Sequence, residues 1–376
     1  MVSRESILEI KTVIPFFGIK RQYAAHRKEL LDAVDKVYSS GRVLDGEYTA
    51  SFERTIAKRC DRTYAVAVNS CSQGLVFAQQ VLFQRPTKIL IPTISFVATL
   101  NSVLMNGNEP VLCDTDNQAL IDLESMDYAI KGAGVGGIMY VNIFGNTVDW
   151  DRFKLTAEFF NQDLKIIEDA AQSFGASYRG QPSGSLGDIS VLSFDPTKNL
   201  PNYGSGGMVL TDDVNVYRTL KDLRDNGKCN GHENIGTNSK MSESDCAQML
   251  VKLKYFDAWQ ERRQDIADYY TANLPAWVDT PETTEGTVHA WHKYVIKVMD
   301  RNSLQLHLSL KGVETKVHYE DPLYEHPVGY PYINYAADLY REASSFCSDC
   351  LSLPIYPEMT DAEVEYVVEA VKSFSS

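Results

Sequence analysis

The sequence has no long apolar run. None of its uninterrupted hydrophobic stretches reaches the roughly eighteen residues that a membrane-spanning helix needs. The N-terminal apolar run at residues 7–11 is too short for a secretory signal and carries charges. An excess of positive charge is also missing, since the net charge is -14 and the sequence pI is about 5.0. These absences argue against a membrane protein and against a general nucleic-acid binder, whose surface must attract phosphate.

The pattern of a metal-binding or disulfide-rich protein is absent too. The seven cysteines are odd in number and scattered, which is typical of reduced thiols in a cytoplasmic protein. Cys347 and Cys350 have C-x-x-C spacing, but no second pair and no histidine cluster accompanies them, so we predict no metal site. Repeats and low-complexity segments are lacking. The remaining composition, 44% hydrophobic and 23% charged, is that of an ordinary globular chain.

What the sequence does contain is an alternation of strand and helix patterns. Nearly apolar strands are expected at residues 64–68, 89–91, 111–114, 137–144, 166–168, 189–194 and 208–211, and helices at 21–39, 47–59 and 75–83. Such strands predict a mostly parallel sheet that is covered by helices on both faces. We predict a large domain over residues 1–255 and a smaller C-terminal α/β domain over residues 256–376.

The C-terminal third is expected to begin with a long helix. Ser242 caps a helical pattern that runs to about Asn273. Strands are predicted near residues 294–298 and 314–319, and a last helix over residues 361–374. The polar, glycine-rich stretch at residues 223–240 is long for a loop in a compact chain, which predicts a functional or intersubunit segment.

A lysine and an acid follow two of the predicted strands. Lys198 lies just after the strand at residues 189–194 and is followed by the glycine-rich turn 204–207, and Asp169 ends the strand at residues 166–168. Ligands of parallel sheets bind at the carboxyl ends of the strands. A lone lysine here would be interpreted as a solvated loop side chain. With Asp169 it supplies the two contacts that pyridoxal phosphate requires, a Schiff base and a partner for the pyridinium nitrogen.

Other strand ends support a site at the same edge. The polar turn at residues 69–74 precedes a helix, so its serines predict either a phosphate site or simply a helix cap. Phe96 is either a core residue or a stacking partner for a flat ring. Ser72, Phe96 and Ser193 all follow strand ends, and this convergence predicts the site.

The G-x-G-x-x-G at residues 132–137 precedes a strand instead of following one, so we do not interpret it as a nicotinamide fingerprint.

Taken in order, these motifs resemble the DegT/DnrJ/EryC1/StrS family of pyridoxal phosphate-dependent sugar-nucleotide aminotransferases. The resemblance covers nearly the whole chain and rests on residues 14–16, 52–53, 92–99, 168–172, 193–199, 206–207, 236–240, 317–319 and 351–354. It implies the aspartate aminotransferase-like fold (fold type I), with a mostly parallel central sheet and a smaller C-terminal domain.

The resemblance also implies roles for individual residues. Lys198 would bind the cofactor covalently and carry the proton between cofactor and substrate carbons, and Asp169 would keep the ring nitrogen protonated. Gln172 would contact the ring hydroxyl, and Phe96 would stack on the ring. The cofactor phosphate would be held by the strand-end hydroxyls and amides of Ser70, Cys71, Ser72 and Ser193.

Four further residues are implied at the periphery of the site. Asn238 would reach the phosphate of the other subunit's cofactor, which implies a homodimer with shared active sites. The substrate side would be formed by Lys240, His318 and Tyr319. Three positions depart from the family pattern: Cys71 replaces a glycine, Ser72 replaces a threonine but keeps the hydroxyl, and Lys240 replaces an arginine. An ammonium cannot make the planar, bidentate contact of a guanidinium, which puts the family's anion contact at Lys240 in doubt.

The implied activity is transamination in the cytoplasm. We expect an amino group to pass from L-glutamate, through pyridoxamine phosphate and with release of 2-oxoglutarate, to a keto-deoxy sugar on a nucleoside diphosphate. The product would be an amino sugar for a surface polysaccharide or glycoconjugate. A sugar dehydratase with the same cofactor and a non-catalytic regulatory homologue are the alternatives, and the retained Lys198 favours transamination over both. The sequence leaves open the nucleotide, the sugar, amination at carbon 3 or carbon 4, and oligomers beyond a dimer.

Overall fold

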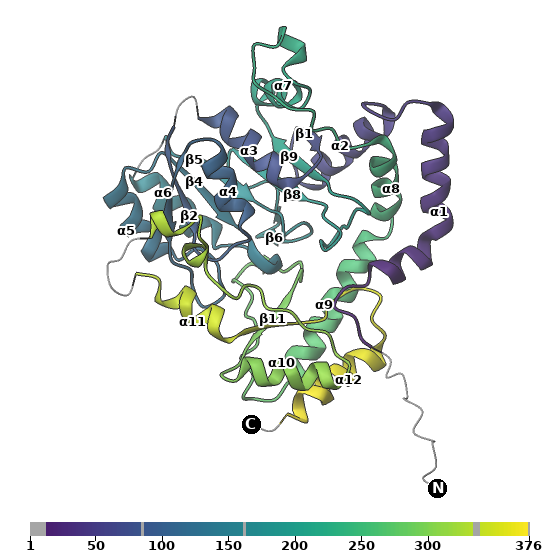
Figure 1. Cartoon of the computed structure of the whole chain (residues 1–376), viewed down its shortest axis with the longest axis vertical. Helices are drawn as coiled ribbons and strands as arrows, with labels where there is room; N and C mark the ends of the chain where they lie inside the picture. Colours follow the sequence, from purple (N-terminus) through teal and green to yellow (C-terminus); the bar gives the residue numbers. More distant parts are fainter. Residues whose placement is uncertain (1–12, 84–85, 161–162, 334–338, 375–376) are drawn as a thin grey trace.

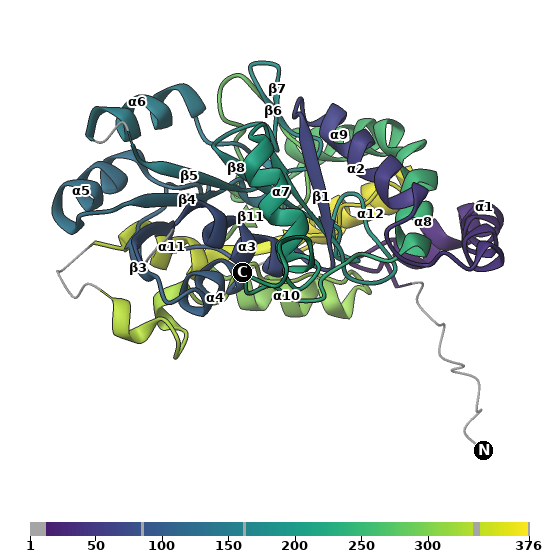
Figure 2. The same ribbon diagram turned by 90° about the horizontal axis from the view of Figure 1, so that it is seen from above.

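The computed structural model describes residues 13–83, 86–160, 163–333 and 339–374. The apolar run at residues 7–11 lies outside them. A seven-stranded sheet forms the centre of the molecule (Figures 1 and 2), in the order β1-β9-β8-β5-β4-β2-β3. Its strands are β1 (Tyr64–Val68), β2 (Lys88–Pro92), β3 (Glu109–Cys113), β4 (Gly137–Val141), β5 (Lys165–Asp169), β8 (Ile189–Ser193) and β9 (Gly207–Thr211).

All of these strands run in one direction except β9, which is antiparallel to both of its neighbours. The predicted mostly parallel sheet is therefore confirmed. Its carboxyl edge gathers the ends of β1, β2, β4, β5 and β8 on one side, because parallel strands end at the same edge. The predicted site residues come from these ends.

Helices cover both faces of the sheet, as the apolar strands require. In β4, Met139 packs in one apolar cluster, whereas Ile138 and Tyr140 pack in another, because successive side chains of a strand point to opposite faces. The covering helices are α2 (Glu47–Arg59), α3 (Cys71–Leu82), α4 (Ala98–Met105), α5 (Leu123–Ala133), α6 (Trp150–Phe160), α7 (Val214–Leu223) and α8 (Glu243–Leu253). The N-terminal helix α1 (Ile19–Ser40) packs on α8 at the margin of the molecule (Figure 1).

A second apolar core forms at the end of the molecule away from α7 (Figure 1). It contains the antiparallel pair β11 (Tyr294–Lys297) and β12 (Cys350–Leu353), together with α9 (Phe256–Asn273), α10 (Arg301–Leu310) and α12 (Asp361–Lys372). The core agrees with a smaller α/β unit, and the boundary between residues 255 and 256 stays a prediction.

The remaining elements are short. They comprise β6 (Ser177–Tyr178), β7 (Gln181–Pro182), β10 (Thr287–Val288), α11 (Arg341–Asp349) and the 3₁₀ turns η1 (Ile143–Gly145), η2 (Lys228–Asn230), η3 (Leu323–Glu325) and η4 (Tyr330–Tyr332). The G-x-G-x-x-G segment closes α5, with Gly134 in the left-handed region at φ +66°, and precedes β4 as predicted.

Two sequence predictions were wrong. The long helix from Ser242 to Asn273 is interrupted after Leu253 and resumes at Phe256. Both of these residues pack into one apolar cluster, so the apolar pattern continues across the break and does not reveal it. The predicted strand at residues 314–319 is an extended segment with one isolated bridge, between Lys316 and Ser352, and it carries cavity side chains instead of a ladder.

Two boundaries differ from the prediction by three residues or more, one at the end of a strand and one at the start of a helix. The predicted strand at residues 137–144 ends at Val141, because the Asn142 side chain turns the chain by accepting from the Val148 N–H and donating to Glu168. The helix predicted from residue 75 begins at Cys71, since the Ser70 hydroxyl caps it by accepting from the Gln73 N–H at 3.2 Å.

Glu168 fixes the turn beside β5 from inside the core. Its carboxylate is fully buried and accepts hydrogen bonds from the hydroxyls of Ser183 and Ser190, both at 2.7 Å, and from the N–H groups of Gly184 and Leu186, both at 3.0 Å. Burial raises the pKa of this carboxyl, and the donors oppose the rise. The next residue is Asp169, so the network anchors the strand end on which the predicted site depends.

Removing this carboxylate is expected to destabilise the protein severely. Glu168→Ala leaves several buried donors without an acceptor, so the free energy of unfolding should fall by about 3 kcal/mol or more. Urea unfolding followed by circular dichroism measures the change. Glu109→Ala, which removes an exposed carboxylate on β3, is the control and should change stability by less than about 0.5 kcal/mol. Equal effects of the two substitutions would contradict the role of Glu168.

Candidate active site

A cavity of about 350 Å³ opens at the carboxyl edge of the sheet. Most of the predicted site residues line it together, although they come from segments far apart in the sequence. They are Ser70, Cys71, Ser72, Phe96, Asp169, Gln172, Ser193, Lys198, His318 and Tyr319. The strand ends therefore converge as the sequence analysis predicted.

Asp169 forms the acidic end of this cavity. Its side chain is only 4% exposed, and it accepts from the Thr99 hydroxyl at 2.9 Å and from the Ala171 N–H at 3.2 Å. Burial raises the pKa of the carboxyl, whereas the two hydrogen bonds and the charge of Lys198 lower it. The two hydrogen bonds thus orient the carboxylate but compensate only part of the cost of burying its charge. This suits the carboxylate to pair with a positive ring nitrogen.

Lys198 extends from a tight turn directly after β8. Its N–H donates to the Asp195 carbonyl at 2.9 Å, and the neighbouring Asn199 side chain donates to the Ala290 carbonyl at 2.6 Å. Burial lowers the pKa of the Lys198 ammonium, and the negative charge of Asp169 opposes the change. A lowered pKa increases the fraction of neutral amine, the form that attacks a carbonyl carbon.

The turn before α3 places the start of a helix at the cavity. The first N–H groups of a helix have no acceptor within the helix, and at α3 they belong to residues that line the cavity. Gly207 of β9 packs directly against this turn. A Cβ there would lie 2.7 Å from the Ser70 carbonyl carbon and from the Cys71 nitrogen, so a side chain would displace the turn. Burial raises the pKa of the Cys71 thiol, which therefore stays neutral.

The opposite wall is built from Gln172, Phe96 and the segment that contains His318 and Tyr319. The Gln172 amide donates to the Tyr319 hydroxyl at 3.1 Å and accepts from the Phe144 N–H at 3.0 Å. The rings of Phe96 and Tyr319 lie 6.4 Å apart. Phe96 is 56% exposed, which contradicts a core role and agrees with a stacking surface.

Two predicted residues do not line the cavity. Asn238 is exposed, and Lys240 is ion-paired with Asp225 and lies 3.9 Å from Asp45. Both belong to the loop whose Ser239 carbonyl accepts from the Asn69 N–H at 2.8 Å, next to the start of α3. Their roles remain predictions.

Among the lining residues that the sequence analysis did not predict are Phe17, His292, Lys293 and Lys316. None of them follows a predicted strand of the large sheet. Lys293 precedes β11, and Lys316 lies in the segment predicted as a strand. No signal in the sequence could have placed them here, because only the packing of the C-terminal part against the sheet brings them to it.

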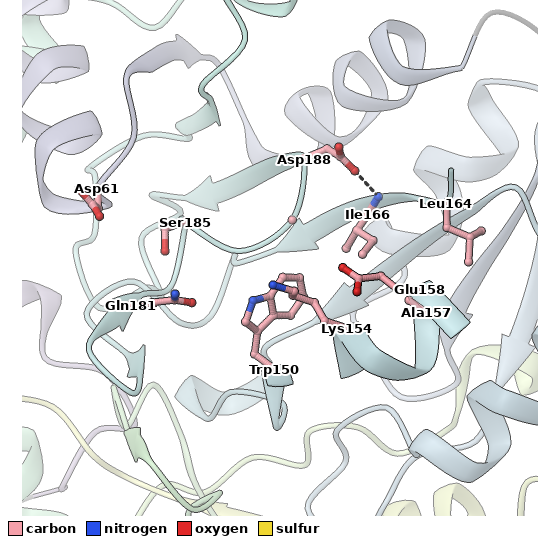
Figure 3. A pocket seen from close by; sticks show the side chains of 11 residues that line it. Asp61, Trp150, Lys154, Ala157, Glu158, Leu164, Ile166, Gln181, Ser185 and Asp188 are labelled. Atoms are coloured by element: carbon pink, nitrogen blue, oxygen red, sulfur yellow. Dashed lines mark hydrogen bonds between the residues drawn. The ribbon is translucent and has the colours of Figure 1, made fainter. Parts of the chain in front are cut away.

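A larger cavity, of about 480 Å³, lies at the opposite edge of the sheet. Figure 3 shows its lining, with the Ile166 N–H donating to Asp188 at 2.8 Å near the amino ends of β5 and β8. Lys154 and Glu158 of α6 are exposed there. Because ligands of such sheets bind at the carboxyl ends of the strands, the smaller cavity with Lys198 and Asp169 is the candidate active site.

Within the described ranges, no group of three or more His, Cys, Asp or Glu side chains could hold a metal ion. Cys347 and Cys350 are buried thiols at the junction of α11 and β12. None of the helices in those ranges combines the length and hydropathy that crossing a bilayer demands.

The residues present fit a flat, phosphorylated ring. The cavity volume is within the range of small-molecule sites, with a half-buried amine, a buried acid and a helix N-terminus around one space. This arrangement on a mostly parallel sheet defines a pyridoxal phosphate-dependent enzyme of fold type I. Residues 24–372 match the model of the DegT/DnrJ/EryC1/StrS aminotransferase family, and the chain belongs to this family. Pyridoxal phosphate is the cofactor of the family.

Similar proteins cover almost the whole chain. The dTDP-3-amino-3,6-dideoxy-alpha-D-galactopyranose transaminase of Aneurinibacillus thermoaerophilus is 32% identical, over 96% of this chain and 99% of its own. The crystal structure of Streptomyces venezuelae DesV in complex with a ketimine intermediate has a TM-score of 0.91 and 31% identity, over 96% and 98% of the two chains. NtdA from Bacillus subtilis with bound PMP has a TM-score of 0.87 and 27% identity, over 97% and 85%.

Proposed function

We propose that this aminotransferase moves the amino group of L-glutamate to a keto-deoxy sugar carried on a nucleoside diphosphate. The observation that carries the proposal is the meeting of Lys198 and Asp169 in one cavity, in a chain of this family. The similar transaminase from Aneurinibacillus supports a sugar-nucleotide acceptor, since its name specifies a dTDP-linked amino sugar.

Each residue has a defined task in this proposal. Pyridoxal phosphate, when bound, supplies an electron sink for the carbanion that proton removal leaves. The Lys198 amine would remove the proton from the substrate carbon that bears the amino group and deliver it to the cofactor carbon on the other side of the nitrogen. Asp169 holds the positive charge on the ring nitrogen, and Thr99 orients that carboxylate. The amides at the start of α3, with Ser193, hold the phosphate.

The proposal includes a cytoplasmic homodimer. The exposed Asn238 and the adjacent Lys240 would complete the partner's site, which would explain why neither lines the cavity of its own chain. Seven cysteines without a disulfide suit a reducing compartment. Light scattering of the purified protein measures the assembly, and a monomer that transaminates at full rate would contradict shared sites.

Amine incorporation tests the activity directly. The protein, loaded with pyridoxal phosphate, should convert L-glutamate to 2-oxoglutarate in a half reaction without any sugar. It should then aminate at least one member of a panel of 3-keto and 4-keto sugar nucleotides, detected by mass spectrometry. Loss of a hydroxyl from the sugar without gain of nitrogen would indicate a dehydratase instead. A protein that acquires no pyridoxal absorbance after addition of the cofactor would refute the proposal.

A further inference from the structure

The cavity is lined by two lysines that the proposed chemistry does not use. Lys293 and Lys316 line the cavity together with Lys198, against the two acids Asp169 and Asp195. Three lysines and two acids therefore surround the space where a substrate must bind.

The two histidines of the cavity add no charge. Burial and the neighbouring lysines lower the pKa of His292 far below its usual value, and burial with Lys293 and Lys316 lowers the pKa of His318 to about 2. Both rings are neutral near pH 7 and make fixed hydrogen bonds: His292 with the Asn199 side chain at 3.1 Å, and His318 with the Ser352 hydroxyl at 2.8 Å. The lysines, and not the histidines, are therefore the cationic side chains of this cavity.

Lys293 and Lys316 share one pair of aromatic rings. The Lys293 ammonium lies 4.5 Å from the centre of the Phe17 ring and 5.1 Å from that of Phe16. The corresponding distances for Lys316 are 4.8 Å and 5.7 Å. In the part of the chain that the structure describes, neither ammonium has a carboxylate within 4.0 Å. In the described residues, the partners shown for these two ammonium groups are the rings and, for Lys293, the charge of Asp195.

Aromatic rings compensate such charges incompletely. Lys293 is 5% exposed, and a cation–π contact is weaker than the cost of taking an ammonium out of water. Burial, together with Lys198, Arg263 and Lys316, lowers the pKa of Lys293 far below its usual value. An anion in the adjacent space would stabilise the charged form of both lysines.

Three distant segments hold these groups in place. The Lys293 N–H donates to the Phe144 carbonyl at 3.1 Å, the Lys316 N–H donates to the Ser352 carbonyl at 3.3 Å, and the Phe16 N–H donates to the Glu314 carboxylate at 2.9 Å. Phe16 and Phe17 pack edge to face at 4.8 Å. The cluster is therefore built into the backbone framework and is not a chance meeting of surface side chains.

We propose that Lys293 and Lys316, with Phe17 in contact with both, form a subsite for an anionic group of the substrate. The anion is a carboxylate of the amino donor or a phosphate of the sugar nucleotide, and both would be held in the same cavity as Lys198. The inference rests on the proposed function, because that function supplies both anions.

Binding of unreactive anions tests the subsite without turnover. The probes are glutarate, a dicarboxylate without an amino group, and inorganic pyrophosphate, each titrated calorimetrically into the full chain loaded with pyridoxal phosphate. Lys293→Met and Lys316→Met should each weaken binding of at least one probe by about tenfold to a hundredfold. Lys36→Met removes an exposed lysine of α1 that does not line the cavity, and it should leave both affinities unchanged.

The pattern of losses identifies the anion. Weaker glutarate binding alone assigns the subsite to the donor carboxylate, and weaker pyrophosphate binding alone assigns it to the acceptor. Unchanged affinities of both probes in both variants would overturn the proposal. So would a parallel loss of affinity for pyridoxal phosphate, since the lysines would then serve the cofactor. If Lys293→Met does not fold, the exposed Lys316 still provides the test.

Failure of the proposed function can be distinguished from failure of the anion subsite. If no sugar nucleotide is aminated while the probes still depend on Lys293 and Lys316, the anion subsite stands and the acceptor class is wrong. If amination proceeds while the lysines have no effect on either probe, the function stands and the subsite is wrong.

Discussion

Lys198→Ala is expected to lower the rate of transamination by at least about a thousandfold, with the fold retained. The amine is the only group proposed to bind the cofactor covalently and also to move the proton, so its removal abolishes both tasks. Burial lowers its pKa, which makes it a better nucleophile and proton acceptor at neutral pH. The side chain extends into the cavity and the turn is held by main-chain bonds, so truncation should leave the fold unchanged.

Two measurements separate these tasks. Borohydride reduction followed by peptide mass spectrometry should find the cofactor attached at residue 198 in the parent protein and at no lysine in the variant. Added methylamine should restore part of the activity of Lys198→Ala, because a small amine in the emptied space can carry the proton. A variant that transaminates as well as the parent would show that the assignment is wrong.

Asp169→Asn is expected to lower the rate by about a hundredfold or more, also with the fold retained. Asparagine has nearly the same shape, and its oxygen can still accept from the Thr99 hydroxyl or the Ala171 N–H. What it lacks is the negative charge, without which the ring nitrogen loses its proton and the ring withdraws fewer electrons. Thermal unfolding and steady-state rates, measured on the same preparations, distinguish this loss from misfolding.

Asp116→Asn provides the matched control. Like Asp169, Asp116 accepts two hydrogen bonds, in its case from the N–H groups of Gln118 at 2.8 Å and Leu120 at 3.0 Å, and burial raises its pKa to about 6. It does not line the cavity. The substitution of Asp116 should leave the rate of transamination within about twofold of the parent, because the side chains that line the cavity are unchanged. Equal losses in the two variants would assign Asp169 a structural role.

The candidate site was predictable wherever its residues follow strands of the central sheet. Asp169 and Ser193 are the last residues of the apolar strands β5 and β8. Lys198 lies in the turn that follows β8, and the serines near residue 70 follow β1. Strand and turn patterns depend on residues that are close in the sequence. Parallel pairing then brings the carboxyl ends of the strands to one edge of the sheet, independently of the rest of the chain. The same locality explains why the Ser70 cap and the order of strands and helices were recoverable.

Prediction failed where local patterns were ambiguous. The interruption between α8 and α9 leaves the apolar spacing intact, because Leu253 and Phe256 face one cluster on both sides of it. Residues 314–319 alternate like a strand, yet only Lys316 pairs with a neighbour, through Ser352. In both places the decision depends on contacts made by residues distant in the sequence.

The sequence by itself determined the sheet, the lysine and acid at its edge, and thereby the class of chemistry. Only the tertiary structure decided that Lys293, Lys316 and Phe17 close the cavity, and that Asn238 and Lys240 stay outside it within one chain. The physical reason is the range of the contacts: strand ends are positioned by neighbouring residues and main-chain pairing. The cavity wall exists only once the C-terminal core and the N-terminal segment pack against the sheet.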